Sequence, residues 1–257
     1  MKLVTILNRV LPKPIKNVIL DMTNLKVPRN QDYIKRFGLI HLWTLNDPYY
    51  FIHIPKCAGN SIDKYLTENH IATMTLGHSV ISESYEYPYD VSRPDNSRAF
   101  CVVRNPLFRT PSAYFFLKQG GMHEEDAKIY HENLSQYSDF KDFVINGLGN
   151  RTNRESILQV THFIPQSNFL LNKNGQLCVA RENILYFENL HEGFANYLKS
   201  RGKKIIGFPW ENKTNGCQDY SGLYRLKNGE WDFKMITIVL DAYKKDFEFF
   251  EFSRELS

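Results

Sequence analysis

Short apolar runs and stretches with helical periodicity alternate along the chain from residue 49 onward. The runs at 49–54 and 98–103 are rich in aromatic and β-branched residues, which predicts two buried strands. Pro55 ends the first run. Asn105-Pro106 ends the second run and opens a helix, because proline is favoured in the first turn of a helix. This alternation predicts an α/β layered fold with a mostly parallel sheet.

Helical periodicity predicts several helices around these strands. Residues 61–69 have an apolar face and predict one helix. A second helix is expected from Pro106 to about Lys118, with Pro111 disturbing its middle. Residues 122–160 are polar and loosely patterned, and we expect them to be helical as well.

The C-terminal part of the chain carries the clearest helical pattern. Strands are predicted at 177–180 and 184–187, and a helix at 191–200. A long helix is predicted over 231–250, because apolar residues recur there at helical spacing: Phe233, Ile236, Leu240, Tyr243, Phe247 and Phe250.

The composition is that of a folded globular protein. Hydrophobic residues make up 42% and charged residues 23% of the chain, which is enough for a sizeable core. The formal net charge of +4 is a mild bias toward anionic ligands, far short of the charge typical of nucleic-acid-binding proteins. The four cysteines contain no CxxC pair. The sequence therefore supports neither a disulfide framework nor a zinc site, and we expect no metal.

Residues 1–48 form a basic N-terminal segment, which we separate from a single domain at 49–257. Positive charge gathers there, with nine Lys or Arg against three Asp in residues 1–60. The apolar run Leu3–Leu7 is shorter than a signal-peptide core and far below the ~20 residues that span a bilayer. We expect no membrane span and a cytoplasmic protein with free thiols.

The first candidate site is the turn within residues 51–61, which read FIHIPKCAGNS. The first turn of a helix offers backbone N–H groups and the positive end of a dipole, which favours an anion. Gly59 permits close approach of an anion, and Lys56 adds a full charge. Asn60 and Ser61 can cap the helix or bond the anion. The alternative is a plain capped helix with a solvated Lys56, and the segment is not a GxxxxGK[ST] loop.

The second candidate site is the segment RNPLFRTPSAY, which begins at Arg104. Arg104 ends the second predicted strand, and ligands in open α/β sheets bind at the carboxyl ends of strands. Arginine suits bidentate contact with phosphate. Ser112 lies about two turns into the next helix and could share the same anion. The alternative is that Arg104 pairs with a core carboxylate and Ser112 caps a turn disturbed by Pro111.

Together the two segments resemble the sulfotransferases that use 3′-phosphoadenosine 5′-phosphosulfate, especially the carbohydrate sulfotransferase branch and its bacterial relatives. That family carries a strand–turn–helix like FIHIPKTAGTS and then RxPxxRxxSxY, matched here by residues 51–61 and by Arg104, Pro106, Arg109, Ser112 and Tyr114. The resemblance spans roughly residues 49–252 and includes similar segments at 166–170, 186–190, 212–214 and 243–250. It implies a three-layer, P-loop-like, mostly parallel sheet flanked by helices.

The resemblance also implies roles for individual residues. The 5′-phosphosulfate would be held by Lys56, Cys57, Ala58, Gly59, Asn60 and Ser61. The 3′-phosphate would be held by Arg104 and Ser112, and the nucleotide would be lined from the C-terminal side by Lys213 and Thr214. Cys57 departs from the usual threonine and Asn60 from the usual threonine or serine, and the lost hydroxyl contacts could lower donor affinity. Cys57 is also a candidate reactive thiol, because it lies near a helix N-terminus and Lys56.

Sulfuryl transfer requires an in-line acceptor atom, neutralised charge on the transferred group and a stabilised leaving group, as phosphoryl transfer does. Lys56 is placed to stabilise the bridging oxygen. His78 in Thr75-Leu-Gly-His-Ser79 resembles the Gly-His of carbohydrate sulfotransferases, and we expect it to be the base. His162 could contact the acceptor, while Glu188 is an alternative base that more simply forms a structural ion pair.

Three functions remain open from the sequence. The first is a sulfotransferase that acts on a hydroxyl of a carbohydrate or another hydroxyl-bearing acceptor, with residues 122–160 shaping the acceptor cleft. The second is a nucleotide-dependent phosphotransferase of P-loop-like fold, which a Mg²⁺ requirement would support. The third is a nucleotide-binding module without turnover, for which the departures at Cys57 and Asn60 speak. Nothing in the sequence indicates the oligomeric state.

Overall fold

Four parallel strands build the central sheet of the computed structural model. The structure describes residues 49–69, 71, 73–77, 97–172, 174–203, 225–226 and 229–254. These residues belong to one compact unit, Pro48–Ser257. The basic segment at 1–48 lies outside the described residues. The strand order is β2-β1-β3-β4, with β1 Tyr49–His53, β2 Thr73–Gly77, β3 Ala99–Val103 and β4 Ile184–Tyr186.

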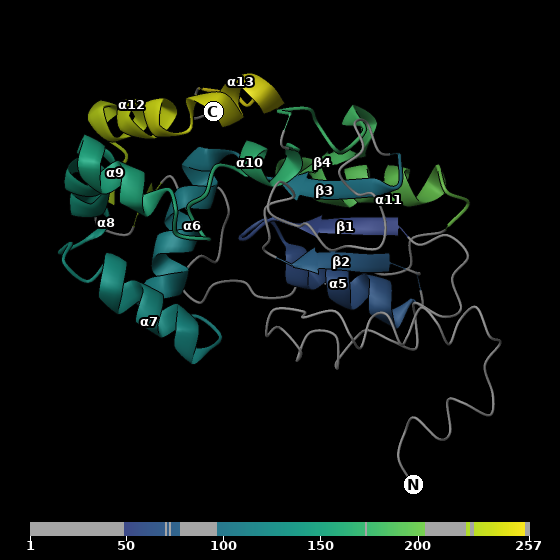
Figure 1. Ribbon diagram of the computed structural model, residues 1–257, viewed down its shortest axis with the longest axis horizontal. Coiled ribbons are helices and arrows are strands. Elements are labelled where there is room, and N and C mark those ends of the chain that lie inside the picture. Colours follow the sequence, from purple (N-terminus) through teal and green to yellow (C-terminus); the bar gives the residue numbers. More distant parts are fainter. Residues whose placement is uncertain are drawn as a thin grey trace, which may run out of the picture. The chain divides into compact units, whose positions relative to one another are not determined.

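The helices follow the strands in the α/β order that the sequence predicts (Figure 1). Their bounds are α5 Gly59–Glu68, α6 Pro106–Lys118, α7 Glu124–Asn133, α8 Phe140–Asp142, α9 Arg151–Ile157, α10 Gln166–Leu170, α11 Leu190–Lys199, α12 Phe233–Ala242 and α13 Lys244–Phe250. A π-helix η2 spans Phe143–Leu148, and 3-10 turns span Arg181–Asn183 (η3) and Phe187–Asn189 (η4). A short antiparallel pair joins β5 Arg225–Leu226 to β6 Gly229–Glu230. The predicted α/β class is confirmed.

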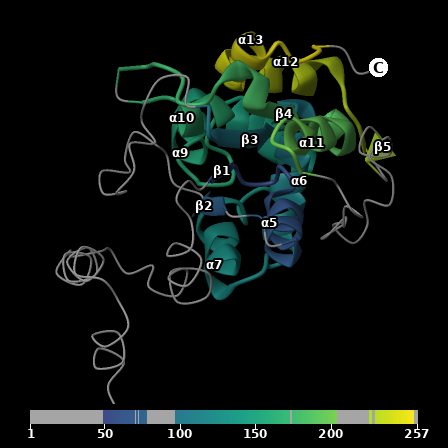
Figure 2. The ribbon, with the colours of Figure 1, turned by 90° about the vertical axis from the view of Figure 1, so that its right-hand side faces the viewer.

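The sheet is buried on both faces. On one face, α5 and α11 lie side by side (Figure 2), and the Tyr65 and Phe194 rings meet edge to face at 5.4 Å. Phe100 in β3 reaches Tyr197 of α11 at 4.5 Å between ring centroids. Ile52 and Cys101 point to the opposite face and are fully buried. Burial on both faces explains why the strands read as continuous apolar runs.

Helix α6 begins directly after β3 because its start is capped. The Oδ1 atom of Asn105 accepts a hydrogen bond from the Leu107 N–H at 3.0 Å, and Pro106 occupies the first helical position. The sequence predicted that Pro111 disturbs this helix, but α6 runs unbroken to Lys118. Burial of Tyr114 and neighbouring side chains holds the helix together despite the missing N–H of Pro111.

The predicted helical character of residues 122–160 is confirmed, but this region is more than a polar cover. Helix α7 has no buried residue, whereas the segment after it supplies a large aromatic cluster to the core. The Phe143 ring of η2 lies 5.1 Å from Tyr114 and 5.2 Å from Phe163. Within η2 the buried residues are Phe143, Val144, Gly147 and Leu148, so this segment turns one apolar side toward the core.

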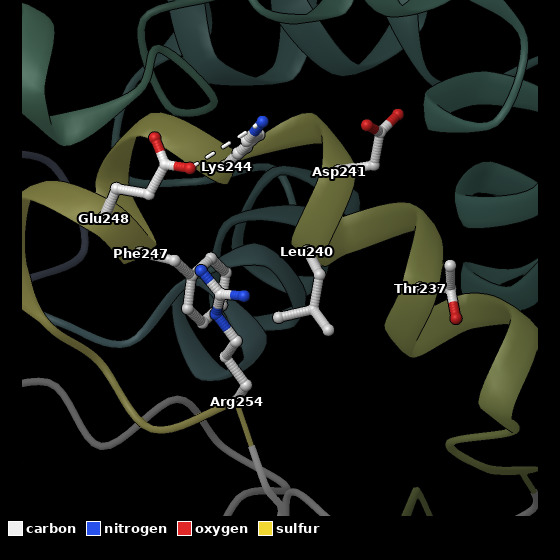
Figure 3. A pocket seen from close by; sticks show the side chains of 7 residues that line it. All are labelled: Thr237, Leu240, Asp241, Lys244, Phe247, Glu248 and Arg254. Atoms are coloured by element: carbon white, nitrogen blue, oxygen red, sulfur yellow. Dashed lines mark ion pairs between the residues drawn. The ribbon is translucent and has the colours of Figure 1, made fainter.

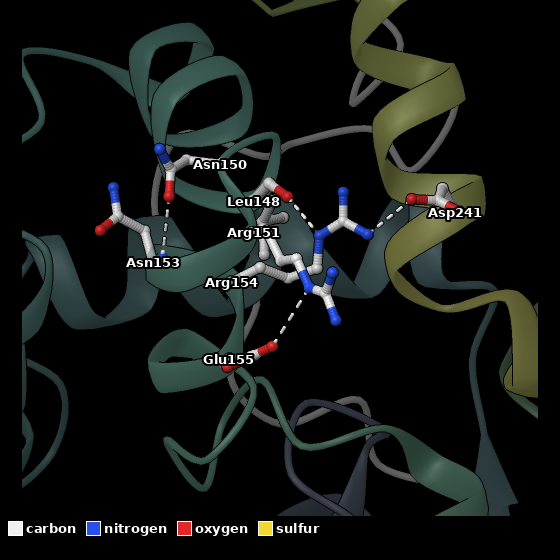
Figure 4. A network of polar contacts seen from close by, with 7 residues as sticks. All are labelled: Leu148, Asn150, Arg151, Asn153, Arg154, Glu155 and Asp241. Carbon is white, nitrogen blue, oxygen red and sulfur yellow. Dashed lines mark hydrogen bonds and ion pairs between the residues drawn. The ribbon is translucent and has the colours of Figure 1, made fainter.

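One arginine joins α9 to α12 (Figure 4). The Nε atom of Arg154 donates to the Leu148 carbonyl, and Nη1 pairs with the Asp241 carboxylate. Asn150 caps α9 by accepting the Asn153 N–H at 3.1 Å. These contacts fasten the helices that follow η2 to the C-terminal pair of helices.

Two predictions for the C-terminal part were wrong in detail. Only an isolated bridge from Leu177 to Leu171 forms within the predicted strand 177–180. The predicted helix at 231–250 divides at Tyr243 into α12 and α13. Phe233 is 84% exposed, because the Asp232 cap starts α12 there and Met235 takes the buried position.

Gly59, the first residue of α5, lies directly against the His53 side chain of β1. A Cβ atom at Gly59 would lie 1.7 Å from Nε2 of His53, whose buried ring stacks on Phe51 and pairs with Asp63 at 3.4 Å. The His53 ring therefore has little freedom to move away.

We predict that Gly59→Ala lowers the free energy of unfolding by about 1–3 kcal/mol through overpacking. Urea unfolding followed by circular dichroism measures the change. Gly193→Ala in α11 is the matched control, since a Cβ there meets its nearest neighbours at 3.9 Å and alanine favours helix. Equal stability of Gly59→Ala and the native chain would contradict the close packing at this point.

Candidate functional site

The two candidate segments meet at the carboxyl edge of the sheet. Strands β1 and β3 are neighbours and run in parallel, so the β1–α5 loop (residues 54–58) and the β3–α6 turn (Arg104–Asn105) leave the same edge. The Nη1 atom of Arg104 donates a hydrogen bond to the Lys56 carbonyl at 3.4 Å. The two cationic segments that the sequence analysis singled out are therefore in contact in the structure.

The β1–α5 loop has an uncommon backbone. Lys56 and Ala58 both adopt left-handed conformations, with φ values of 67° and 62°, which cost about 1–2 kcal/mol per residue outside glycine. Alternation of this kind aims successive N–H groups at one point. Strain of this kind is commonly retained at ligand-binding sites.

Helix α5 begins without a side-chain cap. Its N-cap is Ala58, whose carbonyl accepts a hydrogen bond from the Ile62 N–H at 3.1 Å. The sequence predicted that Asn60 or Ser61 could cap this helix. Both instead lie inside its first turn, so neither acts as the cap. The positive end of the α5 dipole faces the same edge of the sheet as Lys56 and Arg104.

Lys56 rests on an aromatic ring beside a second cation. Its Nζ atom lies 3.5 Å from the centroid of the Phe116 ring. Burial and the nearby Arg104 guanidinium lower the pKa of Lys56 to about 8, while Asp126 acts in the opposite direction. The ammonium is therefore still mostly charged at pH 7, although its charged form is held less firmly than in water.

Arg104 is held in a similar way. It is buried, and its Cζ atom lies 4.2 Å from the centroid of Phe187, the residue after β4. The next residue, Glu188, accepts a hydrogen bond from the Asn105 N–H at 2.8 Å. Glu188 thus holds the β3–α6 turn through a backbone hydrogen bond, where the sequence favoured a structural ion pair.

The Cys57 side chain points into the core. It is 1% exposed, and its S–H lies within hydrogen-bonding distance of Gln166 Oε1 at 3.3 Å and of the Pro55 carbonyl. Burial raises the pKa of the Cys57 thiol to about 12. The hypothesis of a reactive thiol was wrong, because the loop turns this side chain away from the helix N-terminus that would lower its pKa. The outer surface of the loop at Cys57 consists of backbone.

His162 lies beside Phe116 and close to Asp126. The His162 ring centroid is 5.4 Å from that of Phe116, and its Nε2 atom is 3.7 Å from Asp126 Oδ1. Burial lowers the pKa of His162 to about 4, so its imidazole is neutral at pH 7. His162 is only 6% exposed, so most of its surface lies in the protein interior.

The remaining predicted residues differ in how far the structure places them. Asn60 is exposed, and its Nδ2 atom approaches the Met122 sulfur at 3.4 Å, beside the start of α7. Ser112 is buried on α6. His78, Lys213 and Thr214 lie outside the described residues. Gly77, the last residue of β2, pairs with His53 in register.

Three buried residues hold the backbone of the site in place, and the sequence predicted no role for them: Arg109, Gln166 and Asp246. Arg109 donates from Nε to the Pro55 carbonyl at 3.0 Å and from Nη1 to the Ile164 carbonyl at 2.9 Å. Gln166 bonds both backbone groups of Arg104 at 2.8 Å, and Asp246 of α13 accepts the Gln166 N–H at 2.7 Å. Arg109 and Gln166 stand within the quoted motifs, which was the signal available in the sequence.

A surface hollow lies on α12 and α13 (Figure 3), and it includes none of the predicted site residues. It is lined by Thr237, Leu240, Asp241, Lys244, Phe247, Glu248 and Arg254. In the described ranges, no group of three or more His, Cys, Asp or Glu could hold a metal ion. None of the helices described has the length and apolar character of a membrane span.

Comparison with known protein families agrees with this geometry. A profile described as the sulfotransferase family matches residues 46–253, which covers both candidate segments and the C-terminal helices. Searches among curated proteins and among solved structures found no match. The match extends over most of the chain, and we conclude that this protein belongs to the sulfotransferase family.

Proposed function

We propose that the protein transfers a sulfuryl group from 3′-phosphoadenosine 5′-phosphosulfate to a hydroxyl of a carbohydrate or a similar acceptor. The observation that carries the donor assignment is the contact of Arg104 with the Lys56 carbonyl, beside the uncapped start of α5. Two cations and a helix N-terminus at one edge of a sheet suit a ligand with two separate anionic groups.

The donor fits the electrostatics of this site. Burial lowers the pKa of Lys56, and repulsion by the nearby Arg104 lowers it further. An anion bound between them relieves that repulsion. In the proposed arrangement the 5′-phosphosulfate lies over the β1–α5 loop and the first turn of α5, and the 3′-phosphate lies against Arg104 and the Ser112 side of α6. Lys213 and Thr214 are proposed to line the nucleotide.

The proposed reaction is an in-line displacement at sulfur. The acceptor oxygen forms a bond to sulfur while the bond from sulfur to the bridging oxygen of the 5′-phosphate breaks. His78 takes the hydroxyl proton, and adenosine 3′,5′-bisphosphate leaves. Lys56 stabilises the negative charge that grows on the bridging oxygen, which is the role of a preorganised cation. The leaving group is already stable as an anion, so the step needs no metal in principle.

Residues around Phe116 are proposed to face the acceptor. Asn60 approaches Met122 just before α7, Asp126 in α7 acts on the charge of Lys56, and the buried His162 lies beside Asp126. The aromatic residues after α7 are buried in the core, so they cannot line an acceptor cleft. Within 122–160, only the neighbourhood of α7 is left for that role. In this arrangement His162 orients the Asp126 side chain, which faces the acceptor.

The first prediction concerns the nucleotide. Saturating adenosine 3′,5′-bisphosphate, at 100-fold its dissociation constant, should raise the melting temperature by about 5–10 °C, since a ligand of the folded state stabilises it. ATP and ADP should raise it far less. Arg104→Gln should abolish most of the shift, whereas Arg151→Gln at an exposed site on α9 should preserve it. An equal shift with ATP that depends on Mg²⁺ would favour a phosphotransferase.

The second prediction concerns the base. His78→Ala should lower the turnover number by about 10²–10⁴-fold, the usual contribution of a general base. Donor binding should change little, because the base acts on the acceptor. His191→Ala at an exposed position of α11 is the control. Loss of nucleotide affinity in parallel with the rate would assign His78 to the donor site instead.

The third prediction concerns pH. The pKa of Lys56 is about 8 in the free protein, and a bound anion raises it, so binding takes up a proton above pH 8. The dissociation constant of adenosine 3′,5′-bisphosphate should rise by no more than about twofold from pH 7 to 8 and then by up to about tenfold per pH unit. Calorimetric titration measures it. In Lys56→Met this alkaline rise should vanish, and its persistence would assign the titration to another group.

A further inference from the structure

We propose that Gln166 is a positioning residue that fixes the spacing between the β1–α5 loop and the β3–α6 turn, so that both ends of one nucleotide bind together. The inference rests on the proposed function for its ligand. Its geometric basis is independent of that function, because it consists of contacts among described, buried side chains.

A single amide binds both segments. Oε1 of Gln166 accepts the Arg104 N–H at 2.8 Å and lies 3.3 Å from the Cys57 sulfur, and Nε2 donates to the Arg104 carbonyl at 2.8 Å. The Gln166 side chain is fully buried. Since Arg104 follows the last residue of β3, the amide continues the pairing of that strand by one residue, as a neighbouring peptide group would. An amide supplies both a donor and an acceptor in this fixed geometry without any change of protonation.

Asp246 sets the orientation of that amide. Its Oδ2 atom accepts the Gln166 N–H at 2.7 Å and lies 3.4 Å from Gln166 Nε2, and its Oδ1 atom accepts the Ser167 N–H at 2.8 Å. A carboxylate only accepts hydrogen bonds, so the NH₂ group of Gln166 faces Asp246. The oxygen of the amide must then face Cys57 and the Arg104 N–H. Helix α13 thus determines which way the amide points.

Arg109 provides a second link between the β1–α5 loop and the segment that carries Gln166. Arg109 joins the Pro55 carbonyl of the β1–α5 loop to the Ile164 carbonyl, two residues before Gln166. The loop is therefore tied to the segment that carries Gln166 from both Cys57 and Pro55. The β3–α6 turn is tied to the same segment through Arg104.

The fixed spacing matters because the two cations repel each other. Without the Gln166 contacts, Lys56 and Arg104 can relax apart, and a ligand must then bear the cost of bringing them back. A ligand that contacts only one segment does not bear this cost. Preorganisation of two subsites favours a two-headed ligand beyond the sum of its halves.

The experiment compares one whole ligand with its two halves. Adenosine 3′,5′-bisphosphate, adenosine 5′-monophosphate and adenosine 3′-monophosphate are titrated calorimetrically against the native chain and Gln166→Met, with displacement titrations for the weak halves. We expect Gln166→Met to weaken the bisphosphate by about 10–100-fold and each half by less than about threefold. The KM for the donor should rise by the same factor as the bisphosphate dissociation constant, with a smaller change in kcat.

An exposed glutamine provides the matched control for Gln166→Met. Gln159→Met makes the same change at an exposed glutamine and should leave all three affinities unaltered. A loss confined to adenosine 3′-monophosphate and matched by the bisphosphate would mean that Gln166 serves Arg104 alone. That result, or unchanged affinity for the whole ligand, overturns the proposal.

A second variant covers the case in which Gln166→Met does not fold. In Gln166→Glu the new carboxyl faces Asp246, Arg104, Arg109 and Cys57, and the adjacent Asp246 carboxylate favours its protonated form. Protonation restores a donor toward the Arg104 carbonyl. The bisphosphate affinity of this variant, expressed relative to the native chain, should therefore recover toward one as pH falls from 8 to 5.5. A ratio that does not vary with pH counts against the hydrogen-bonding role.

A ligand-independent measurement separates this proposal from the proposed function. Amide hydrogen exchange of the Arg104 N–H and of residues 56–59 should accelerate at least tenfold in Gln166→Glu at pH 8 while the strands β1 and β3 keep their protection. If the native chain fails to bind the bisphosphate, the function is wrong, and the exchange result still decides whether Gln166 holds the two segments. Unchanged exchange overturns the positioning role.

Discussion

Two positive charges held side by side at a largely desolvated edge of a sheet are the constraint on which this site depends. Lys56 and Arg104 each lose hydration and each feel the other, and the lowered pKa of Lys56 reports both effects. Aromatic rings beneath the two groups, Phe116 and Phe187, offset part of that cost through cation–π contacts. Such an arrangement is unfavourable for the free protein and favourable for binding an anion.

The parallel sheet makes this arrangement possible. Neighbouring parallel strands end at the same edge, so β1 and β3 deliver one cation each, and α5 and α6 begin there with the positive ends of their dipoles. The rest of the molecule holds these segments in place. Buried hydrogen bonds from Arg109, Gln166 and Asp246 tie the edge to α6, α10 and α13. The C-terminal helix therefore acts on a site whose residues lie far away in the sequence.

The structure also explains why cysteine at position 57, where the family usually has threonine, leaves the backbone of the β1–α5 loop intact. Cys57 contributes its backbone to the outer surface of the loop and its sulfur to the core, where it meets Gln166. The left-handed φ values of Lys56 and Ala58 determine that direction. A residue that packs inward here need only be small and tolerate one hydrogen bond, which a thiol does. Asn60, by contrast, is exposed at the mouth of the site, where its side chain can face a ligand.

The sequence alone determined the class of fold, the strands at the two motifs, the helices that follow them and the cationic pair Lys56 and Arg104. These features depend on local periodicity and on the rule that parallel strands share a carboxyl edge. Tertiary structure alone decided the inward direction of Cys57, the exposure of Phe233, the continuity of α6 through Pro111 and the support from Gln166 and Asp246. The reason is physical: side-chain direction depends on loop φ values and on partners that lie far away along the chain, as Gln166 lies 109 residues from Cys57. Local patterns carry no record of either.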